Sequence, residues 1–250
     1  MKLFTNSKRS LFAALAGLTV TANAASISVN TGPAGTEVDG QTAGVVATSV
    51  WNDKLAGNFG ATDVKDDSST TLVGTTVSVN TSWTNTSGSG TSDGHHTLMH
   101  GGMDNGGGPQ GWTMTNIPYA SYDVYIYYDG GSNDSRGGSY QVWDSDNSDA
   151  VLASQSGYDI ATFSGTYIQA VGDGTDGAGQ GLDTNYVVLS GLTASNIKIR
   201  SIADQLGGSD SVTRAPMNGF QIVEASAIPE PSSAILALLG LIGFVSRRKR

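Results

Sequence analysis

Short stretches of alternating hydrophobic and polar residues run through most of the chain, separated by clusters of Gly, Ser, Thr, Asn and Asp. The strongest pattern covers residues 117–128, and one face of it carries Tyr122, Val124, Ile126 and Tyr128. The opposite face carries Asp123, Tyr125 and Tyr127. A period of two residues is typical of a β-strand with two different faces. The same pattern predicts strands at residues 26–30, 71–79, 117–128, 139–143, 150–153, 160–168, 185–190, 196–202 and 220–223.

These elements indicate an all-β protein, an antiparallel β-sandwich or jelly roll with hardly any helix. Long helical periodicity is missing, so a parallel α/β sheet with crossover helices is excluded. We find no repeat of roughly 20–50 residues, which argues against a solenoid or propeller. The strands at 117–128 and 139–143 are expected to form a hairpin. Residues 45–55 fit a short helix or a loop over the sandwich, and residues 80–94 are expected to form a long loop.

The first 24 residues read as a secretory signal. Lys2, Lys8 and Arg9 precede an apolar stretch at residues 11–20, and Ala22-Asn23-Ala24 fits the small-x-small cleavage pattern. We therefore predict a signal peptide at residues 1–24 and a mature chain that begins at Ala25.

The last 23 residues have three parts. Pro229-Glu230-Pro231 comes first, residues 234–245 are apolar, and the chain ends in Arg247-Arg248-Lys249-Arg250. As a helix, residues 232–246 would span roughly 20 Å, less than the ~30 Å hydrocarbon core. The segment is nevertheless apolar all round and is closed by positive charge, which favours a membrane stop over a core helix. This divides the chain into a signal peptide at 1–24, a β domain at 25–225 and a tail with a short transmembrane helix at 226–250.

Removing both ends makes the body strongly acidic. The full chain has 13 Lys and Arg and 22 Asp and Glu; 7 basic residues and 1 acidic residue lie in the ends, which leaves the body near −15. A body of this charge is unsuited to nucleic acid or to anionic membrane surfaces, and it suits divalent cations and an extracellular setting. The chain has no Cys, so disulfides and thiolate zinc sites are excluded and an apolar core has to provide stability.

The tail resembles the PEP-CTERM sorting signal of Gram-negative bacteria, on the Pro-Glu-Pro tripeptide, the Ser pair, the apolar segment and the terminal Arg cluster. This resemblance implies passage through the secretion machinery and transient anchoring in the inner membrane. It also implies processing near Pro229, Glu230 and Pro231 by an exosortase, a membrane protease-transpeptidase. The destination would be the cell surface, the outer membrane or the extracellular matrix. Proteins with this signal are frequently associated with exopolysaccharide or biofilm matrix.

The body carries a second, structural resemblance. Residues 98–104, 122–127, 185–193 and 214–223, in this order, look like uncharacterised exported β-sandwich proteins with sorting tails. Those are similar in turn to galactose-binding-like jelly rolls. The resemblance implies a fold and no reaction.

Aromatic residues are the first candidates for ligand binding, because their faces can stack on sugar rings. Trp83 and Trp112 lie in or beside Gly-, Ser- and Thr-rich stretches and are expected at the surface, whereas core packing is favoured for Trp51 and Trp143. One face of the 117–128 strand is expected to be core and the other partly exposed. The glycan-stacking residues we predict are Trp83, Trp112, Tyr125 and Tyr127.

Two acidic, Gly-rich loops are candidates for structural calcium, which prefers six to eight oxygen ligands. Their carboxylates are those of Asp144, Asp146, Asp149, Asp173 and Asp176. Neither loop has the twelve-residue calcium-loop pattern that ends in Glu, so solvated hairpin loops are the alternative.

All three histidines lie within residues 95–100, but Gly94, Gly101 and Gly102 favour a solvated loop there over a helix. A metal site would use His96, His100 and Asp104. Residues 90–94 match G-x-S-x-G, yet a Ser/Gly tract stands where a nucleophile elbow needs a strand, so we expect no catalytic serine. The mature body has only two Glu, which also disfavours glycoside hydrolysis by paired carboxylates.

The sequence therefore predicts an exported, non-enzymatic surface or matrix protein whose sandwich binds carbohydrate or exopolysaccharide, or has a structural role. The alternative is a secreted hydrolase that acts on polysaccharide. No cofactor is expected beyond possible structural calcium, and no nucleic acid is expected as a partner.

Overall fold

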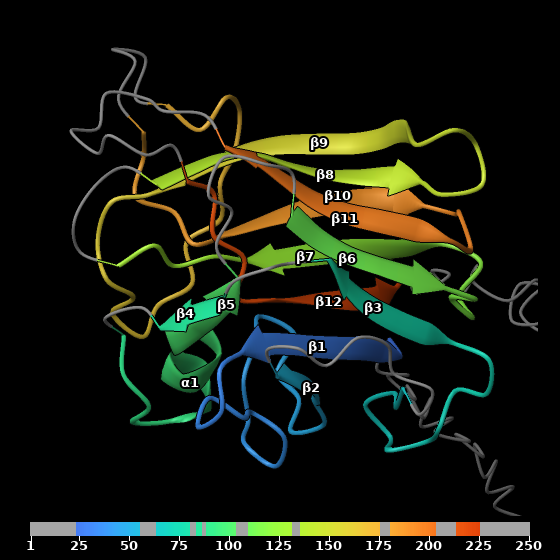
Figure 1. Ribbon diagram of the computed structural model, residues 1–250, viewed down its shortest axis with the longest axis horizontal. Helices are drawn as coiled ribbons and strands as arrows, with labels where there is room; N and C mark the ends of the chain where they lie inside the picture. The colour runs from blue at the N-terminus through green and yellow to red at the C-terminus, as the bar shows by residue number, and fades with distance from the viewer. Residues whose placement is uncertain are drawn as a thin grey trace, which may run out of the picture.

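The computed structural model describes residues 24–55, 64–80, 84–86, 89–103, 110–131, 136–175, 181–203 and 214–225, and these form a two-sheet β-sandwich (Figure 1). One sheet has the order β10-β7-β12-β1-β2, with strands β1 Ser26–Gly32, β2 Asn52–Leu55, β7 Tyr122–Tyr127, β10 Tyr186–Leu192 and β12 Gly219–Glu224. The other has the order β3-β6-β11-β8-β9, with β3 Thr76–Asn80, β6 Gln110–Thr115, β8 Arg136–Asp144, β9 Ala150–Asp159 and β11 Ile197–Ala203. A small pair, β4 Thr84–Thr86 and β5 Gly101–Met103, and one helix, α1 Gly94–His100, lie at one end.

The prediction of an antiparallel β-sandwich is confirmed. Every strand pair within the two large sheets is antiparallel except β1 with β2. From β6 onward the chain moves repeatedly between the two sheets, as it does in jelly rolls. The stretches predicted at 26–30, 71–79, 117–128, 139–143, 150–153, 185–190, 196–202 and 220–223 all contain strands.

The core lies between the sheets and is built from the alternating faces read in the sequence. On β7 the predicted inward residues Tyr122, Val124 and Ile126 are fully buried, as is Tyr128 just after it. They face apolar residues of the other sheet, including Trp112 of β6, within one cluster of buried residues. Burying this apolar surface is what holds the two sheets together in a chain without disulfides.

The prediction that strands 117–128 and 139–143 form a hairpin is wrong. Strand β7 pairs with β10 and β12, whereas β8 pairs with β9 and β11 in the other sheet. Alternation along a strand predicts that it has two faces, but it carries no information about which strand lies beside it. The strand expected at 160–168 is also absent, and β6 was missed because glycines at 106–108 and 111 obscure its pattern.

A second buried cluster covers the outer face of the β7 sheet. It contains Val38, Ala43, Trp51, Leu98, Met99, Tyr127 and Phe163, so it joins the 33–51 segment, α1 and the 160–168 segment to the sheet. Of the two alternatives for residues 45–55, the covering loop is the one found, followed by β2. Trp51 is buried, as expected.

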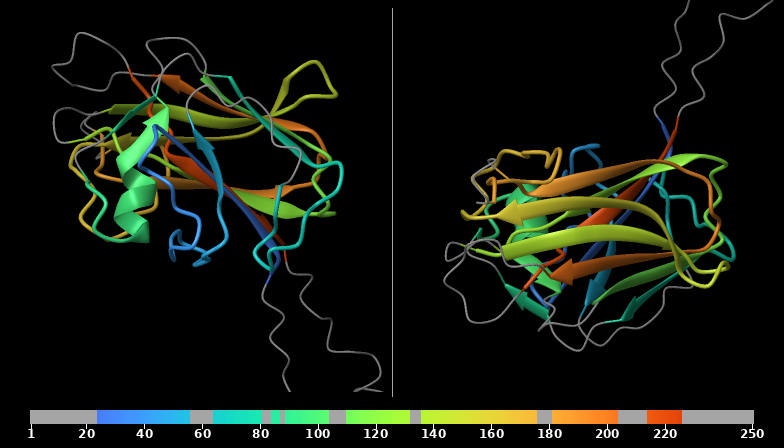
Figure 2. Two further views of the ribbon diagram at one scale, coloured as in Figure 1. Left: turned by 60° about the horizontal axis from the view of Figure 1, so that its bottom comes forward. Right: turned by 90° about the horizontal axis from the view of Figure 1, so that it is seen from above.

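The two ends of the sandwich differ. The start of β1 and the end of β12 lie side by side at one end, and α1 lies at the other (Figure 2). Within the residues described, no helix is long and apolar enough to cross a bilayer. The predicted signal peptide before Ala24, and Pro229, Glu230, Pro231 and the terminal Arg247, Arg248, Lys249 and Arg250, lie outside the described residues.

Candidate functional site

The three histidines lie on α1, not in the loop that the sequence favoured. Asp93 caps the helix, because its Oδ1 accepts the His96 backbone N–H at 2.9 Å. Leu98 and Met99 are fully buried against the sandwich, and that burial compensates for the glycines at either end of so short a helix. Gly94 is required at its position, since a Cβ there would lie 2.4 Å from the Thr42 carbonyl oxygen.

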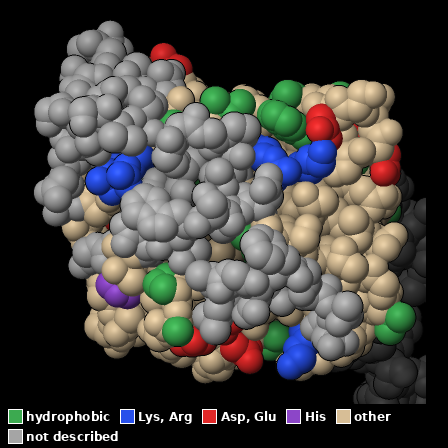
Figure 3. Space-filling view, in the orientation of Figure 1, with side chains coloured by type: hydrophobic (Ala, Val, Ile, Leu, Met, Phe, Trp, Pro, Cys, Tyr) green, Lys and Arg blue, Asp and Glu red, His purple; other side chains and the backbone are tan. Residues whose placement is uncertain are grey.

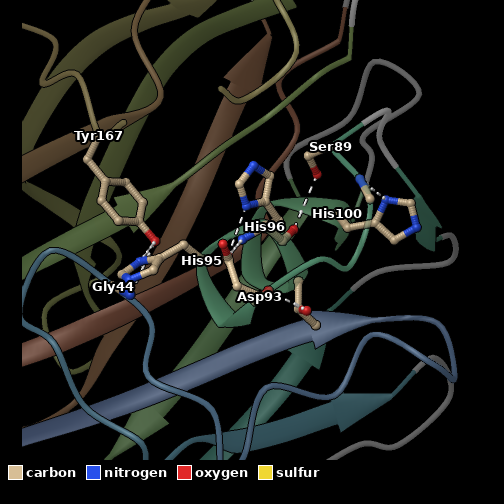
Figure 4. A network of polar contacts seen from close by, with 9 residues as sticks. Gly44, Ser89, Asp93, His95, His96, His100 and Tyr167 are labelled. Atoms are coloured by element: carbon tan, nitrogen blue, oxygen red, sulfur yellow. Dashed lines mark hydrogen bonds and ion pairs between the residues drawn. The ribbon is translucent and has the colours of Figure 1, made fainter. Parts of the chain in front are cut away.

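Each histidine ring makes a separate contact (Figure 4). His95 Nδ1 lies 3.1 Å from the Tyr167 hydroxyl, and His96 Nδ1 lies 2.9 Å from Asp93 Oδ1. His100 Nδ1 accepts the Gly90 N–H at 3.1 Å. Histidine is visible at the surface in Figure 3 where α1 lies in Figure 1. Because the three rings are held by three different partners, they are not arranged around a common point where they could bind one ligand together.

The residues that the structure describes contain no group of three or more His, Asp or Glu side chains placed to hold a metal ion. Asp104, the third ligand of the hypothetical histidine site, lies outside them. The G-x-S-x-G match gains a helix after it but no strand directly before it, because residues 89–93 are turn and bend. The structure therefore does not supply the context of a nucleophile elbow.

A group of aromatic rings lies beside α1 on the outer face of the β7 sheet. The Tyr167 ring is the centre of this group, with centroids 5.5 Å from His95, 5.4 Å from Tyr127 and 6.2 Å from Tyr186. The Tyr125 and Tyr186 rings lie nearly parallel, 16° apart, with centroids at 6.5 Å. We call the partly exposed members, Tyr125, Tyr167, Tyr186 and His95, the tyrosine face.

The tyrosine face is built by cross-strand neighbours. Tyr186 of β10 stands opposite Tyr127 of β7, and Tyr125 lies two residues earlier on the same face of β7. Partial burial raises the pKa of the Tyr125 hydroxyl, and the negative charge of Asp123 adds to the increase. Burial also raises the pKa of the Tyr186 hydroxyl, so Tyr125 and Tyr186 both stay neutral hydrogen-bonding groups at physiological pH.

A buried polar network attaches the loop at 43–48 to the sheet beside the tyrosine face. Gln221 is fully buried on β12; its Nε2 donates to Ser28 Oγ at 2.9 Å and to the Val46 carbonyl at 2.8 Å. The Tyr127 hydroxyl donates to Gln221 Oε1 and accepts the Val45 N–H. These bonds satisfy groups that would otherwise be buried without partners, so they order both the loop and the Tyr127 ring.

Two of the four predicted glycan-stacking residues are corrected by the structure. Trp112 is fully buried, with its Nε1 donating to Thr31 Oγ1 at 2.7 Å and its ring against Phe220. Tyr127 is fully buried as well, because the second cluster covers its face of the sheet. Tyr125 is partly exposed, and Trp83 lies outside the described residues.

Trp143, for which we expected core packing, is only partly buried on β8. Its Nε1 donates to Gln141 Oε1 at 2.7 Å.

The predicted calcium carboxylates are engaged in turn and surface contacts. Asp144 Oδ1 accepts the Asp146 N–H at 2.9 Å, and Asp149 lies 2.6 Å from the Lys198 ammonium group. Asp173 Oδ1 accepts the N–H and hydroxyl of Thr175, and those bonds lower its pKa. Asp176 lies outside the described residues, so calcium at either loop stays a prediction.

A buried pair of aspartates was not predicted from the sequence. Asp129 follows β7 and Asp159 ends β9, and their exposed fractions are 3 % and 1 %. Asp159 Oδ2 accepts the Gly130 N–H at 2.5 Å, while Asp129 accepts the Gly131 N–H at 2.8 Å. Burial, followed by the charge of Asp129, raises the pKa of Asp159 to about 9. Thirty residues separate the two in sequence, so only the sandwich brings them together.

The comparisons with known proteins bear on the tail alone. Residues 227–250 match the family model of the PEP-CTERM protein-sorting motif. No curated protein and no solved structure matches the chain, so no catalytic family is shown and the galactose-binding-like resemblance has no support from a relative. The matched motif implies an exosortase as the processing partner. The chain is thus an exported protein, sorted by an exosortase through its C-terminal motif.

Proposed function

We propose that the exported sandwich binds carbohydrate at the cell surface or in the extracellular matrix, with the tyrosine face as its contact surface. The observation that carries this proposal is the pair of nearly parallel, partly exposed rings of Tyr125 and Tyr186. Both rings are partly exposed on neighbouring strands, so a sugar ring can contact aromatic surface there. The apolar C–H face of a pyranose packs on an aromatic ring, and tyrosine combines that face with a hydroxyl at its edge.

Polar groups around these two rings suit a ligand rich in hydroxyls. The Tyr186 hydroxyl lies 3.5 Å from Gln169 Oε1, and the Tyr167 hydroxyl accepts the Gly44 N–H at 3.2 Å beside His95. Asp123, on the same face of β7 as Tyr125, uses its Oδ1 to accept the Gly191 N–H at 2.9 Å. Amide, hydroxyl, imidazole and carboxylate groups beside an aromatic surface are the means by which proteins orient small polar ligands.

The charge of the body favours neutral polysaccharide over an anionic one. A body near −15 repels polymers of its own sign, and carboxylates outnumber Lys and Arg by 21 to 6 in it. A neutral exopolysaccharide in the surface layer or biofilm matrix fits this charge. The outer membrane or matrix would be the final location, reached through the secretion machinery and transient inner-membrane anchoring.

Polysaccharide hydrolysis gains no support from the carboxylates described. Glycoside hydrolysis needs two carboxyl groups that both reach the scissile bond. Asp129 and Asp159 do lie together, but both are buried. Structural calcium in the acidic loops would be compatible with either role, and a purely structural matrix role is the outcome if no glycan binds.

Binding to exopolysaccharide prepared from the producing cells tests the proposal. Tyr125→Ala and Tyr186→Ala should each weaken binding by about 2- to 10-fold, which corresponds to ~0.5–1.5 kcal/mol for one aromatic contact. Tyr125→Phe should retain most of the affinity, because the ring remains. Trp143→Ala, on the other sheet, is the matched control and should bind like the wild type. If Tyr125→Ala and Tyr186→Ala bind as tightly as the wild type, the tyrosine face is not the site.

A further inference from the structure

Both chain ends of the folded body emerge at the same end of the sandwich. Strands β1 and β12 are antiparallel neighbours, with Ser26 opposite Val223, and the Glu224 N–H donates to the Ala25 carbonyl at 2.8 Å. In both views of Figure 2 the start of β1 and the end of β12 lie together, away from α1. Helix α1 is therefore remote from the point where the sorting motif begins, whereas Tyr125, opposite Gln221 of β12, lies between the two ends.

The folded body continues almost to the processing site. Ala225 is held by its N–H, which donates to the Ser121 carbonyl at 2.9 Å, and the sorting motif begins at residue 227. Pro229 follows Ala225 by four residues, which even fully extended reach at most about 14 Å. An enzyme that acts near Pro229 on the folded protein has to bring its active site within that distance of the sandwich.

The surface at this point is well defined. Two loops, residues 64–70 and 116–121, form it. The first is joined to β1 by the Asp67 N–H, which donates to the Ser26 carbonyl at 2.9 Å, and the second contains Ser121, which accepts the Ala225 N–H. Tyr119 is buried between them, and the charges of Asp66, Asp67 and Glu224 are close enough to raise its pKa further after burial. We call this surface, made by Ala25 and residues 64–70, 116–121 and 223–225, the exit end.

We propose that the exit end is the surface on which the processing exosortase contacts the folded sandwich. The short connection forces the two into contact, because only three residues, 226–228, separate Ala225 from the Pro-Glu-Pro tripeptide. Asp66, Asp67 and Glu224 outnumber Lys65 on this surface, and the resulting net negative charge indicates the nature of the partner. The anionic headgroups of a membrane would repel these carboxylates, so a protein surface with polar or basic groups is the complementary occupant.

The rate of processing in the exporting host tests the proposal with the full-length chain. Ala120→Trp adds bulk to the exit end and Glu224→Lys reverses a charge there; both wild-type side chains are exposed, so the fold should tolerate the changes. Ala161→Trp and Glu37→Lys are matched controls at exposed positions toward the opposite end. Conversion of precursor to processed protein is followed over time by mass and immunoblot. Both exit-end variants should be processed severalfold more slowly, and both controls at the wild-type rate.

A second set of variants with a linker distinguishes contact between the exosortase and the exit end from recognition of the sorting motif itself. A flexible Gly/Ser insertion of about ten residues after Ala225 removes the need for contact. Ala120→Trp and Glu224→Lys should then be processed at the rate of the unsubstituted linker protein. Wild-type rates for both variants at the native spacing would overturn the proposal, and so would equal slowing with and without the linker. Thermal unfolding of the secreted variants checks that a slow rate does not reflect a misfolded body, and none of these outcomes depends on carbohydrate binding.

Discussion

The buried aspartate pair should make the sandwich less stable as the pH rises. Asp159 is 1 % exposed and adjoins Asp129, and burial with that neighbouring charge raises the pKa of its carboxyl group to about 9. In the unfolded chain an aspartate titrates near pH 3.9. Between these two values the folded state holds a proton that the unfolded state has released. The stabilisation is therefore complete below about pH 4 and is lost as the pH rises toward 9.

The loss of stability with pH has an upper limit, because only one proton is released from this carboxyl group. A difference of one bound proton changes the free energy of unfolding by at most about 1.4 kcal/mol per pH unit. From pH 5 to pH 8 the loss from this carboxyl is thus no more than about 4 kcal/mol, against a total of ~5–15 kcal/mol for a typical domain. A change of that size is easily measured.

Asp159→Asn is the decisive variant, because an amide resembles the protonated carboxyl in shape and carries no titrating proton. Urea unfolding of the secreted protein, followed by tryptophan fluorescence at pH 5, 6, 7 and 8, gives the free energy of unfolding at each pH. The wild type should lose stability across this range, and Asp159→Asn should lose clearly less.

Asp173→Asn is the control. Asp173 is exposed and its pKa is lowered by the Thr175 hydrogen bonds, so it is fully ionised above pH 5 and its removal should leave the slope unchanged. If the wild type and Asp159→Asn show the same pH dependence, the carboxyl of Asp159 does not hold the proton and the reasoning is refuted.

Three further substitutions test the packing that supports the tyrosine face and the core. Gly44→Ala should destabilise the fold by about 1–3 kcal/mol in urea unfolding, because φ is +89° and a Cβ would lie 2.5 Å from Gln221 Oε1; an unchanged midpoint would contradict the buried network. Asp93→Ala should cost about 0.5–2 kcal/mol through loss of the α1 cap, measured by thermal unfolding, and no loss would mean that the cap is not formed. Trp112→Ala should cost about 3–5 kcal/mol by opening a cavity, whereas Trp143→Ala at the surface should cost far less, and equal losses would argue against the burial of Trp112.

Residue periodicity was a good guide to the faces of single strands. Tyr122, Val124 and Ile126 alternate with polar or aromatic neighbours and are buried in the core as that alternation predicts. Periodicity failed at β6, where glycines weaken the pattern, and at 160–168, where an apolar stretch packs as an irregular segment. In the latter, Phe163 is buried in the second cluster, but Ile160 and Ile168 are exposed, so hydrophobicity there predicted neither the conformation nor the burial of the whole segment.

The candidate site was less predictable than the fold. Tyr125 was identified as a surface aromatic, but its stacking partner Tyr186 was not, because the two belong to strands about sixty residues apart. Trp112 was misjudged since its Gly- and Thr-rich neighbours are typical of a surface loop, although Phe220 of the other sheet packs against its ring. The histidines were expected in a loop because helix propensity is low around the glycines, and the burial of Leu98 and Met99 outweighed that preference.

The sequence by itself determined two things about this protein: that its body consists of two-faced strands, and that its end carries a sorting motif. Both are local, since alternation is written in neighbouring residues and the motif is contiguous. Only the tertiary structure decided which strands are neighbours, and hence that β7 and β8 lie in opposite sheets and that Asp129 adjoins Asp159. It also placed the start of β1 and the end of β12 together, opposite α1. These relations join residues far apart in the chain, and they follow from how two sheets bury their apolar faces against each other, which no single stretch of residues contains.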